Sequence, residues 1–555
     1  MNSILEANLL ALSAADKKLH ARLAAAEKTN RYAFLKSRSG ETVPANALPL
    51  HSTVDPKREA ERLVAAIPQD TDFLVFLGLG GGFAPKAALE LTGARIVVID
   101  FDIGGIAELF SAIDYSKLLI NERFSLLIDP SDEEIKKIII ERYSPALCGG
   151  IKTIPLRTRT EQDISKFENS AKVIQEAIEI VSSDYSVQAH FGTRWFSNII
   201  RNIKTAGKSH ENFFAVKKSL PSREAAVVAA GPSLDKQLSS IAELKSRKTF
   251  IISSDTALPA LLHNGIEPDA VVSIDCQHIS YYHFLGCDLR NIPLVLDIAS
   301  PPLLCGLSPS PVFFSSGHPL ALYISAYWRH FSRLDTSGGN VTHACLSLAE
   351  IIGAEHITLF GADFSYIRCQ SYARGTYIYP FFSKKQNRLS PIEAQFSAFL
   401  YRSPFLPPED GEKSAQRKNH HETSSLRFYR KKLEEKVSTM TAAVSCAQGL
   451  GAPVSLRKAP HAAPLPQVPF ITETAAVSGV NFLEQYRSDI AALPEADADD
   501  YIKKLNEKER RIFTTLLPYA AAVRKRSARL KQKDLIEEVK RRSAGEIERI
   551  LTAEN

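Results

Sequence analysis

Short apolar segments that alternate with helical stretches constrain the fold of this chain most strongly. They form two groups, one before residue 130 and one after residue 223. Buried parallel strands are typically such uninterrupted apolar runs, because helices cover both faces of the sheet. The expected strands are 73–77, 95–99 and 124–128 in the first group, and 225–229, 249–254, 270–274, 294–296, 312–315 and 357–360 in the second. The sequence therefore predicts the α/β class, with two Rossmann-like doubly wound domains.

Chain length and composition extend this prediction to three domains. A chain of 555 residues is too long for one ordinary core. We expect an N-terminal Rossmann-like domain with a helical bridge over residues 1–215 and a central α/β domain over 216–460. A proline-rich run that includes Pro460 and Pro469 predicts a linker. The charged, helically periodic region over 470–555 predicts a C-terminal helical domain.

Composition excludes several classes of protein. Hydrophobic residues make up 45% of the chain and charged residues 23%, which is typical of a soluble globular protein. No uncharged apolar run of about 18 residues occurs, so we expect no membrane span and a cytoplasmic location. The modest net charge of +6 does not indicate a nucleic-acid partner. The 7 cysteines form no Cys-x-x-Cys pair, which argues against structural zinc and a disulfide framework.

A glycine-rich turn follows the first expected strand. The run Gly78-Leu79-Gly80-Gly81-Gly82 precedes a helical stretch, and the second strand ends at Asp100 and Asp102. This arrangement resembles a dinucleotide fingerprint, although the third glycine has the wrong spacing. Two interpretations remain open, a phosphate-binding turn and a tight strand-to-helix turn without a ligand.

The strongest local signal for a ligand lies after the first strand of the second group, at Ala229-Ala230-Gly231-Pro232-Ser233-Leu234-Asp235. Gly231 allows close approach of a ligand, and Pro232 preorganises the first helical turn. Ser233 can donate hydrogen bonds to an anion at the start of the helix. The pattern predicts a phosphate or nucleotide site, but such a turn also occurs without a ligand.

Further polar residues follow later strands of the same expected sheet. Asp255 and Asp275 come directly after strands 249–254 and 270–274, and Ser337-Gly338 precedes a helical stretch at 341–352. Doubly wound sheets bind ligands at the carboxyl ends of their strands. We therefore expect these residues to face the same crevice as Gly231 and to enclose a nucleotide.

Several segments in order resemble the motility-associated factor (Maf) flagellin glycosyltransferases. These are 229–234, 251–277 and 338–366 in the central domain, and His51 to Glu61 near the N-terminus. The resemblance implies an enzyme that transfers a nonulosonic acid, of the sialic, pseudaminic or legionaminic type, from a CMP-sugar to Ser or Thr hydroxyls of flagellin. CMP-sugar and flagellin are accordingly the expected partners.

The central domain also looks like bacterial sialyltransferases that use CMP-sialic acid. By this resemblance Gly231, Pro232 and Ser233 would hold the CMP phosphate, and Ser337 and Gly338 would contact the cytidine. Asp363 is assigned to the same nucleotide-sugar site. Asp255 and Asp275 lie where those enzymes carry asparagines, and a carboxylate near an anionic donor is repulsive unless it is hydrogen-bonded, protonated or metal-bound.

The catalytic residues implied by the resemblance are two tyrosines and a histidine. Tyr366 and Tyr372 would donate hydrogen bonds to the leaving phosphate, so that an inverting reaction needs neither a metal nor a further cofactor. His421, or its neighbour His420, would be the general base, because histidine titrates near neutral pH.

Two alternative functions remain open. The central domain also resembles archaeal hydroxymethylpterin diphosphokinases, which would use ATP and magnesium with Asp255 and Asp275 as carboxylate ligands. No P-loop lysine accompanies these carboxylates. The third possibility is a non-catalytic flagellin-binding assembly factor.

Overall fold

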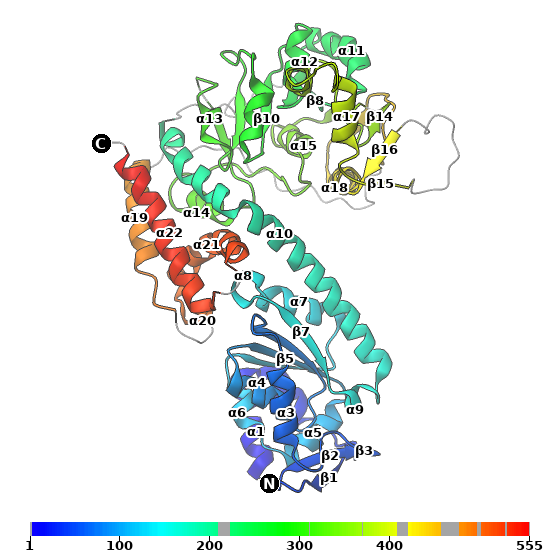
Figure 1. The fold of residues 1–555 in the computed structure, drawn as a ribbon, viewed down its shortest axis with the longest axis vertical. Coiled ribbons are helices and arrows are strands. Elements are labelled where there is room, and N and C mark those ends of the chain that lie inside the picture. Colours follow the sequence, from blue (N-terminus) through cyan, green and yellow to red (C-terminus); the bar gives the residue numbers. More distant parts are fainter. Residues whose placement is uncertain are drawn as a thin grey trace. The chain divides into compact units, whose positions relative to one another are not determined.

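The computed structural model describes residues 3–208, 223–309, 311–368, 370–407, 420–456, 477–496, 501–527 and 530–553 (Figure 1). The chain forms two compact units. The N-terminal unit comprises Met1–Thr193 and Ile490–Ala544, and the central unit comprises Arg194–Asp489 and Gly545–Asn555. The predicted α/β class with two Rossmann-like sheets and a helical C-terminal part is confirmed, whereas the division into three domains stays a prediction.

The N-terminal unit contains a parallel sheet of four strands in the order β6-β5-β4-β7. The three predicted strands are present as β4 (Phe73–Leu77), β5 (Arg95–Asp100) and β6 (Phe124–Ile128). The fourth, β7 (Ile151–Pro155), was not predicted, because this half-exposed edge strand lacks a continuous apolar run. An antiparallel sheet of β1 (Ala33–Lys36), β2 (Thr42–Asn46) and β3 (Leu48–Pro49) was also missed.

Alternate side chains of this sheet build the N-terminal core. Leu74 and Phe76 of β4 and Ile96 and Val98 of β5 belong to one buried cluster, since successive side chains of a strand point to opposite faces. The helices of this unit are α1 (Ser3–Ala15), α2 (Lys17–Ala24), α3 (Pro56–Ala65), α4 (Phe83–Leu91), α5 (Ile103–Ala112), α6 (Ser116–Leu119), α7 (Asp132–Arg142), α8 (Pro145–Cys148), α9 (Arg157–Thr160), α20 (Tyr501–Lys504) and α21 (Glu507–Arg526).

The central unit contains a parallel sheet of seven strands in the order β12-β11-β10-β9-β8-β13-β17. All six predicted strands are present, and β17 (Ala443–Cys446) adds an edge strand. The strand order reverses between β8 and β13, and ligands of doubly wound sheets bind at such a reversal. The other strands are β8 (Glu224–Val228), β9 (Phe250–Ser254), β10 (Ala270–Ser273), β11 (Leu294–Asp297), β12 (Val312–Phe314) and β13 (His356–Phe360).

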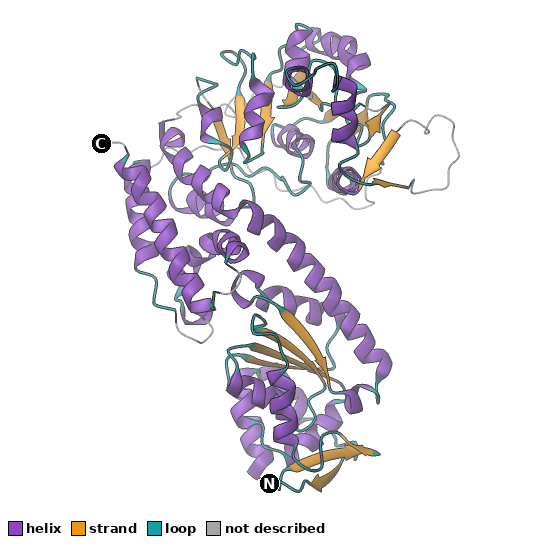
Figure 2. Ribbon diagram, in the orientation of Figure 1, coloured by secondary structure: helices purple, strands orange, loops and turns teal. Residues whose placement is uncertain are grey.

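Helices cover both faces of the central sheet (Figure 2). Ala225 and Val227 of β8 pack in one buried cluster with residues of α15 and α18. Ala226 and Val228 pack in another, with residues of α11 and α12. The helices around this sheet are α11 (Leu234–Ser246), α12 (Leu258–His263), η2 (His278–Phe284), α13 (Pro302–Cys305), α14 (Pro319–Tyr327), α15 (Val341–Ile351), α16 (Ile378–Ser383), α17 (Ile392–Leu400) and α18 (Ser424–Thr439).

Three further helices contribute residues to both units. They are α10 (Ile164–Lys208), which includes the predicted helical bridge, α19 (Gly479–Ala491) and α22 (Gln532–Thr552). A small antiparallel sheet of β14 (Tyr366–Ile367), β16 (His420–Thr423) and β15 (Phe405–Leu406) lies in the central unit. Within the described ranges, no helix is both long and apolar enough to cross a lipid bilayer.

Candidate functional site

The turn after β8 lies at the reversal of strand order. The backbone N–H of Gly231 donates to the carbonyl oxygen of Gly361, which follows β13, over 2.9 Å. A Cβ at position 231 would lie 2.4 Å from that oxygen and 2.4 Å from Oδ2 of Asp363. Glycine is therefore required at this position because two loops meet there.

Asp363 caps the start of α11 at the predicted phosphate site. Its Oδ2 accepts a hydrogen bond of 2.8 Å from the backbone N–H of Ser233, whose Oγ accepts one of 3.0 Å from the Leu450 N–H. Asp363 is 5% exposed, and its burial raises the pKa of the carboxyl above its ordinary value although hydrogen bonds from Ser233 oppose this effect. A donor phosphate that binds the Ser233 N–H must therefore displace Asp363 or share a proton with it.

Asp255, after β9, is a fully buried and fully hydrogen-bonded carboxylate. Its Oδ1 accepts from the backbone N–H of Thr256 over 2.6 Å, and its Oδ2 accepts from Ser273 Oγ over 2.7 Å. Oδ2 also lies 3.3 Å from His283 Nδ1. Burial alone would raise the pKa of Asp255, but the charge and hydrogen bond of His283 and the bonds from Ser273 and Thr256 together lower it. Asp255 is therefore ionised, and its partners offset part of its negative charge. They thereby reduce the repulsion that a free carboxylate would exert on an anionic donor.

Asp275, after β10, lies in the same neighbourhood. Its Oδ1 accepts a hydrogen bond of 2.8 Å from the backbone N–H of Gln277. Burial raises the pKa of Asp275, and the nearby charge of Asp255 adds to this effect. The structure thus brings these two predicted residues together at adjacent strand ends.

Three tyrosines and an arginine lie near Asp255 and Asp275. We call Tyr366, Tyr372, Tyr377 and Arg402 the tyrosine cluster. The rings of Tyr372 and Tyr377 lie 6.2 Å apart, and the Tyr377 ring lies 4.4 Å from the His283 ring. Burial raises the pKa of Tyr372 above its ordinary value, and the neighbouring Tyr377 and Tyr366 add to the effect. Burial also raises the pKa of Tyr366, but a hydrogen bond and the charge of Arg402 oppose it. His283, Tyr377 and Arg402 were not predicted, because no local motif marks them.

The Ser337-Gly338 turn precedes α15 and is built around an aspartate-histidine pair. Asp335 accepts hydrogen bonds from the Ser337 N–H, over 3.0 Å, and pairs with His343 Nε2, also over 3.0 Å. The bond from His343 holds the pKa of Asp335 far below its ordinary range. A Cβ at Gly338 would lie 2.2 Å from His343 Nδ1, and the Tyr429 ring approaches Gly339. These contacts give the turn a structural role in addition to the predicted contact with cytidine.

His421 lies on β16 directly opposite Tyr366 on β14. Residues opposite each other in an antiparallel pair have neighbouring side chains on one face of the sheet. The ring of Phe405 stacks on His421 at 4.5 Å with an interplanar angle of 9°. Among the described residues the His421 ring has no hydrogen-bond or ion-pair partner. Only the backbone of His420 is described, so its predicted role lies outside the described side chains.

In the N-terminal unit, side chains of the protein fill the glycine-rich turn. The Gly81 N–H donates to His51 Nε2 over 2.8 Å, and a Cβ at Gly80 would lie 2.5 Å from that nitrogen. Burial lowers the pKa of His51 to about 4, so the ring is neutral at pH 7. Asp100 accepts a 2.6 Å bond from the Leu79 N–H and pairs with Arg159 at 2.8 Å instead of presenting a free carboxylate to a ribose. These contacts support the interpretation as a turn without a dinucleotide.

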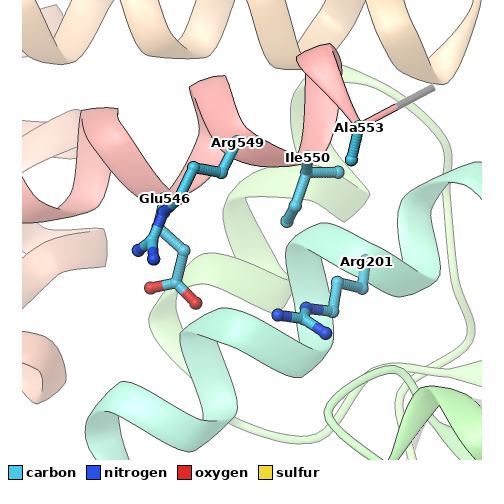
Figure 3. Close-up of a pocket in the computed structure, with 5 residues that line it drawn as sticks. All are labelled: Arg201, Glu546, Arg549, Ile550 and Ala553. Carbon is cyan, nitrogen blue, oxygen red and sulfur yellow. The ribbon is translucent and has the colours of Figure 1, made fainter. Parts of the chain in front are cut away.

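Two pockets lie away from the predicted residues of the central sheet. One, of about 380 Å³ in the N-terminal unit, lies beside the glycine-rich turn and is lined by His51, Leu63, Leu156 and Arg157 among others. The other, of about 360 Å³, lies between α10 and α22 and is lined by Arg201, Glu546, Arg549, Ile550 and Ala553 (Figure 3). Within the described part of the chain, no group of three or more His, Cys, Asp and Glu side chains is arranged to hold a metal ion.

Asp297 lies at the carboxyl end of β11, and its raised pKa can be tested by experiment. It is 4% exposed, and burial raises its pKa to about 6 despite hydrogen bonds from Ala299 and Ser316. Because the folded state holds this proton more tightly, the resulting stability is present below about pH 4 and is lost as the pH rises through 6. We expect the free energy of unfolding of the wild type to lose about 2 kcal/mol through this group between pH 4.5 and 7.5, and we expect Asp297→Asn to abolish that loss. Urea unfolding of both proteins at pH 4.5 and 7.5 measures it, and equal pH dependence would contradict the prediction.

The comparisons with known proteins agree with this architecture. The family model described as 6-hydroxymethylpterin diphosphokinase MptE-like matches residues 197–368. The solved structure of a MAf glycosyltransferase from Magnetospirillum magneticum AMB-1 superposes with a TM-score of 0.55 and 13% sequence identity, covering 100% of this chain and 95% of that chain. The resemblance to Maf glycosyltransferases is thus confirmed in the fold over the whole chain.

Two uncharacterized proteins of Treponema pallidum (strain Nichols) are similar in sequence over shorter stretches. One is 29% identical over 194 residues, which are 33% of this chain and 89% of the relative. The other is 41% identical over 95 residues, which are 17% of this chain and 34% of the relative.

Proposed function

We propose that this protein is a glycosyltransferase that moves a nonulosonic acid from a CMP-sugar to Ser or Thr hydroxyls of flagellin. The observation that carries the proposal is the reversal of strand order between β8 and β13, where the predicted site residues gather. Gly231 and Ser233 lie on one side of this reversal, and the segment after β13 contributes Asp363, Tyr366 and Tyr372. A fold shared with a Maf glycosyltransferase over the whole chain supports the same activity.

Donor binding uses the start of α11 and the neighbouring strand ends. Backbone N–H groups at a helix N-terminus favour a phosphate. Asp255 does not oppose the anionic donor as a free carboxylate would, because His283, Ser273 and Thr256 contact it. Ser337 and Gly338 are proposed to contact the cytidine. Burial raises the pKa of Tyr429, which approaches Gly339, and the nearby Asp275 and Tyr366 add to this effect, so this turn lies close to the tyrosine cluster.

The chemical step requires stabilisation of the leaving CMP and a base for the acceptor hydroxyl. Tyr366 and Tyr372 keep their protons at neutral pH, since their pKa values are raised, and can donate them in hydrogen bonds to the departing phosphate. A neutral histidine then accepts the proton of the attacking hydroxyl. His421, the residue proposed from the sequence, lies across from Tyr366.

Phosphoryl transfer to a pterin is the second candidate function, favoured by the MptE-like family model over residues 197–368. It would use Asp255 and Asp275 as magnesium ligands. Both oxygens of Asp255 already accept hydrogen bonds within the protein. A magnesium ion at Asp255 would have to displace these partners, and a phosphate at the Ser233 N–H would have to displace Asp363. The fold shared with a Maf glycosyltransferase over the whole chain therefore makes sugar transfer the first candidate.

Calorimetry with CMP, CDP and ATP, each with and without magnesium, separates the two functions. We expect metal-independent CMP binding that weakens about tenfold in Ser233→Ala, because the hydroxyl supports both the phosphate site and the loop at Leu450. Ser246→Ala, at the far end of α11, is the control and should bind CMP like the wild type. Magnesium-dependent ATP binding without CMP binding would overturn the proposal in favour of phosphoryl transfer.

A further inference from the structure

Asp255 and His283 form a buried carboxylate-histidine pair that sequence reasoning did not find. His283 lies on η2 and is 9% exposed, and its Nδ1 lies 3.3 Å from Asp255 Oδ2. Ser273 and Thr256 hold the carboxylate in place by hydrogen bonds to its two oxygens. These hydrogen bonds hold the carboxylate in one position, so it fixes the orientation of the imidazole ring.

This contact determines which nitrogen of the neutral ring can accept a proton. A carboxylate beside Nδ1 favours the tautomer with the hydrogen on Nδ1, which leaves the lone pair on Nε2. No described residue donates a hydrogen bond to Nε2. The carboxylate also stabilises the imidazolium that forms when Nε2 takes up a proton.

The pair lies within the tyrosine cluster of the proposed site. The His283 ring contacts Tyr377, which neighbours Tyr372. Asp255 is close enough to Tyr372, Tyr377 and Asp275 for its charge to raise the pKa of each. The ionisable groups around His283 are therefore Asp255, Asp275, Tyr377 and the Cys287 thiol, which contacts the His283 carbonyl oxygen.

We infer that His283, oriented by Asp255, is the general base of the proposed glycosyl transfer. This inference rests on the proposed function. Nε2 of His283 takes the proton of the acceptor hydroxyl while that oxygen bonds to the anomeric carbon. The bond from the anomeric carbon to the CMP phosphate breaks, and its electron pair leaves on the phosphate oxygen. His283 then returns the proton to solvent.

His421 lacks the orienting carboxylate that His283 has. Its ring stacks on Phe405, and no described carboxylate lies within hydrogen-bonding distance of it. His421 lies opposite Tyr366, so a role in positioning the β14 segment accounts for its place.

The test uses the full chain with flagellin and CMP-N-acetylneuraminic, CMP-pseudaminic and CMP-legionaminic acid as donor probes. Whichever donor the wild type transfers is then used for the variants. We expect His283→Gln to lower kcat by about 10²- to 10⁴-fold and to abolish the acidic limb of the pH profile. CMP affinity measured by calorimetry should stay within about twofold of the wild type. His278→Gln, on the exposed start of the same helix, is the matched control and should retain wild-type kcat.

If His283→Gln folds poorly, Asp255→Asn tests the role of His283 independently. Without the carboxylate the ring loses the partner that orients it and stabilises the imidazolium, so kcat and the pH profile should both change in this variant. A wild-type pH profile in both variants, or loss of the acidic limb in His421→Gln instead, would overturn the role of His283. Failure of the wild type to transfer any of the three sugars would contradict the proposed function itself, and CMP binding would show whether the donor site exists.

Discussion

Arg159→Met is expected to lower the free energy of unfolding of the N-terminal unit by about 3–5 kcal/mol, because it leaves a buried carboxylate without its counter-ion. Arg159 and Asp100 both have fully buried side chains and lie 2.8 Å apart. Arg159 also donates to the carbonyl oxygen of Phe101 over 2.9 Å and contacts Asp163 at 2.5 Å. After the substitution Asp100 keeps, among the described residues, the backbone N–H groups of Leu79 and Phe101 as its partners.

Denaturant unfolding of single and double variants measures this effect. Asp100→Asn combined with Arg159→Met removes both charges, so we expect it to recover a large part of the lost stability. Arg157→Met is the matched control, since Arg157 is an exposed residue of the same short helix and its loss should cost less than about 0.5 kcal/mol. A loss for Arg159→Met as small as that of Arg157→Met would show that the pair contributes nothing to stability.

The second large effect is expected on catalysis. We expect Tyr366→Phe combined with Tyr372→Phe to lower the rate of CMP release in single-turnover experiments by about 10²- to 10³-fold. The hydroxyls donate to charge that develops on the leaving phosphate, so their loss raises the barrier without a matching loss of donor binding. Rapid-quench measurement of CMP release at saturating donor separates these two effects.

Tyr401→Phe is the matched control for the double tyrosine variant. Tyr401 is 62% exposed and contacts Phe405 in the same region of the central unit, so its hydroxyl should not affect the rate. Unchanged CMP release in the double variant would remove both tyrosines from the mechanism. A loss confined to donor affinity would assign them to ground-state binding.

The predicted strands and the missed strands differ in burial. Strands such as β4 and β9 are covered on both faces, so their sequences are continuously apolar and could be recognised directly. Most side chains of the edge strands β7 and β17 are half-exposed or exposed, and their sequences carry no comparable signal. The same limit applies to the short strands β14 and β15, which pair with β16 through contacts distant in sequence.

The residues of the candidate site also differ in whether the sequence predicts them. Gly231, Ser233, Asp255 and Asp275 follow strands, and a parallel sheet brings such residues to one edge whatever lies between them. His283 and Tyr377 belong to connecting segments, so nothing in their local sequence shows that they meet Asp255. The capping of Ser233 by Asp363 depends on the adjacency of β8 and β13, two strands that lie far apart in the chain.

The sequence by itself therefore determined the α/β class, the strands of both sheets that are buried on both faces, and the strand ends at which polar residues gather. These features depend on local periodicity and on the position of a residue relative to its own strand. The tertiary structure alone decided which charges are paired, as at Asp255 with His283 and Asp100 with Arg159. A buried charge is stable only beside its partner, and strand order, which local sequence does not encode, selects that partner.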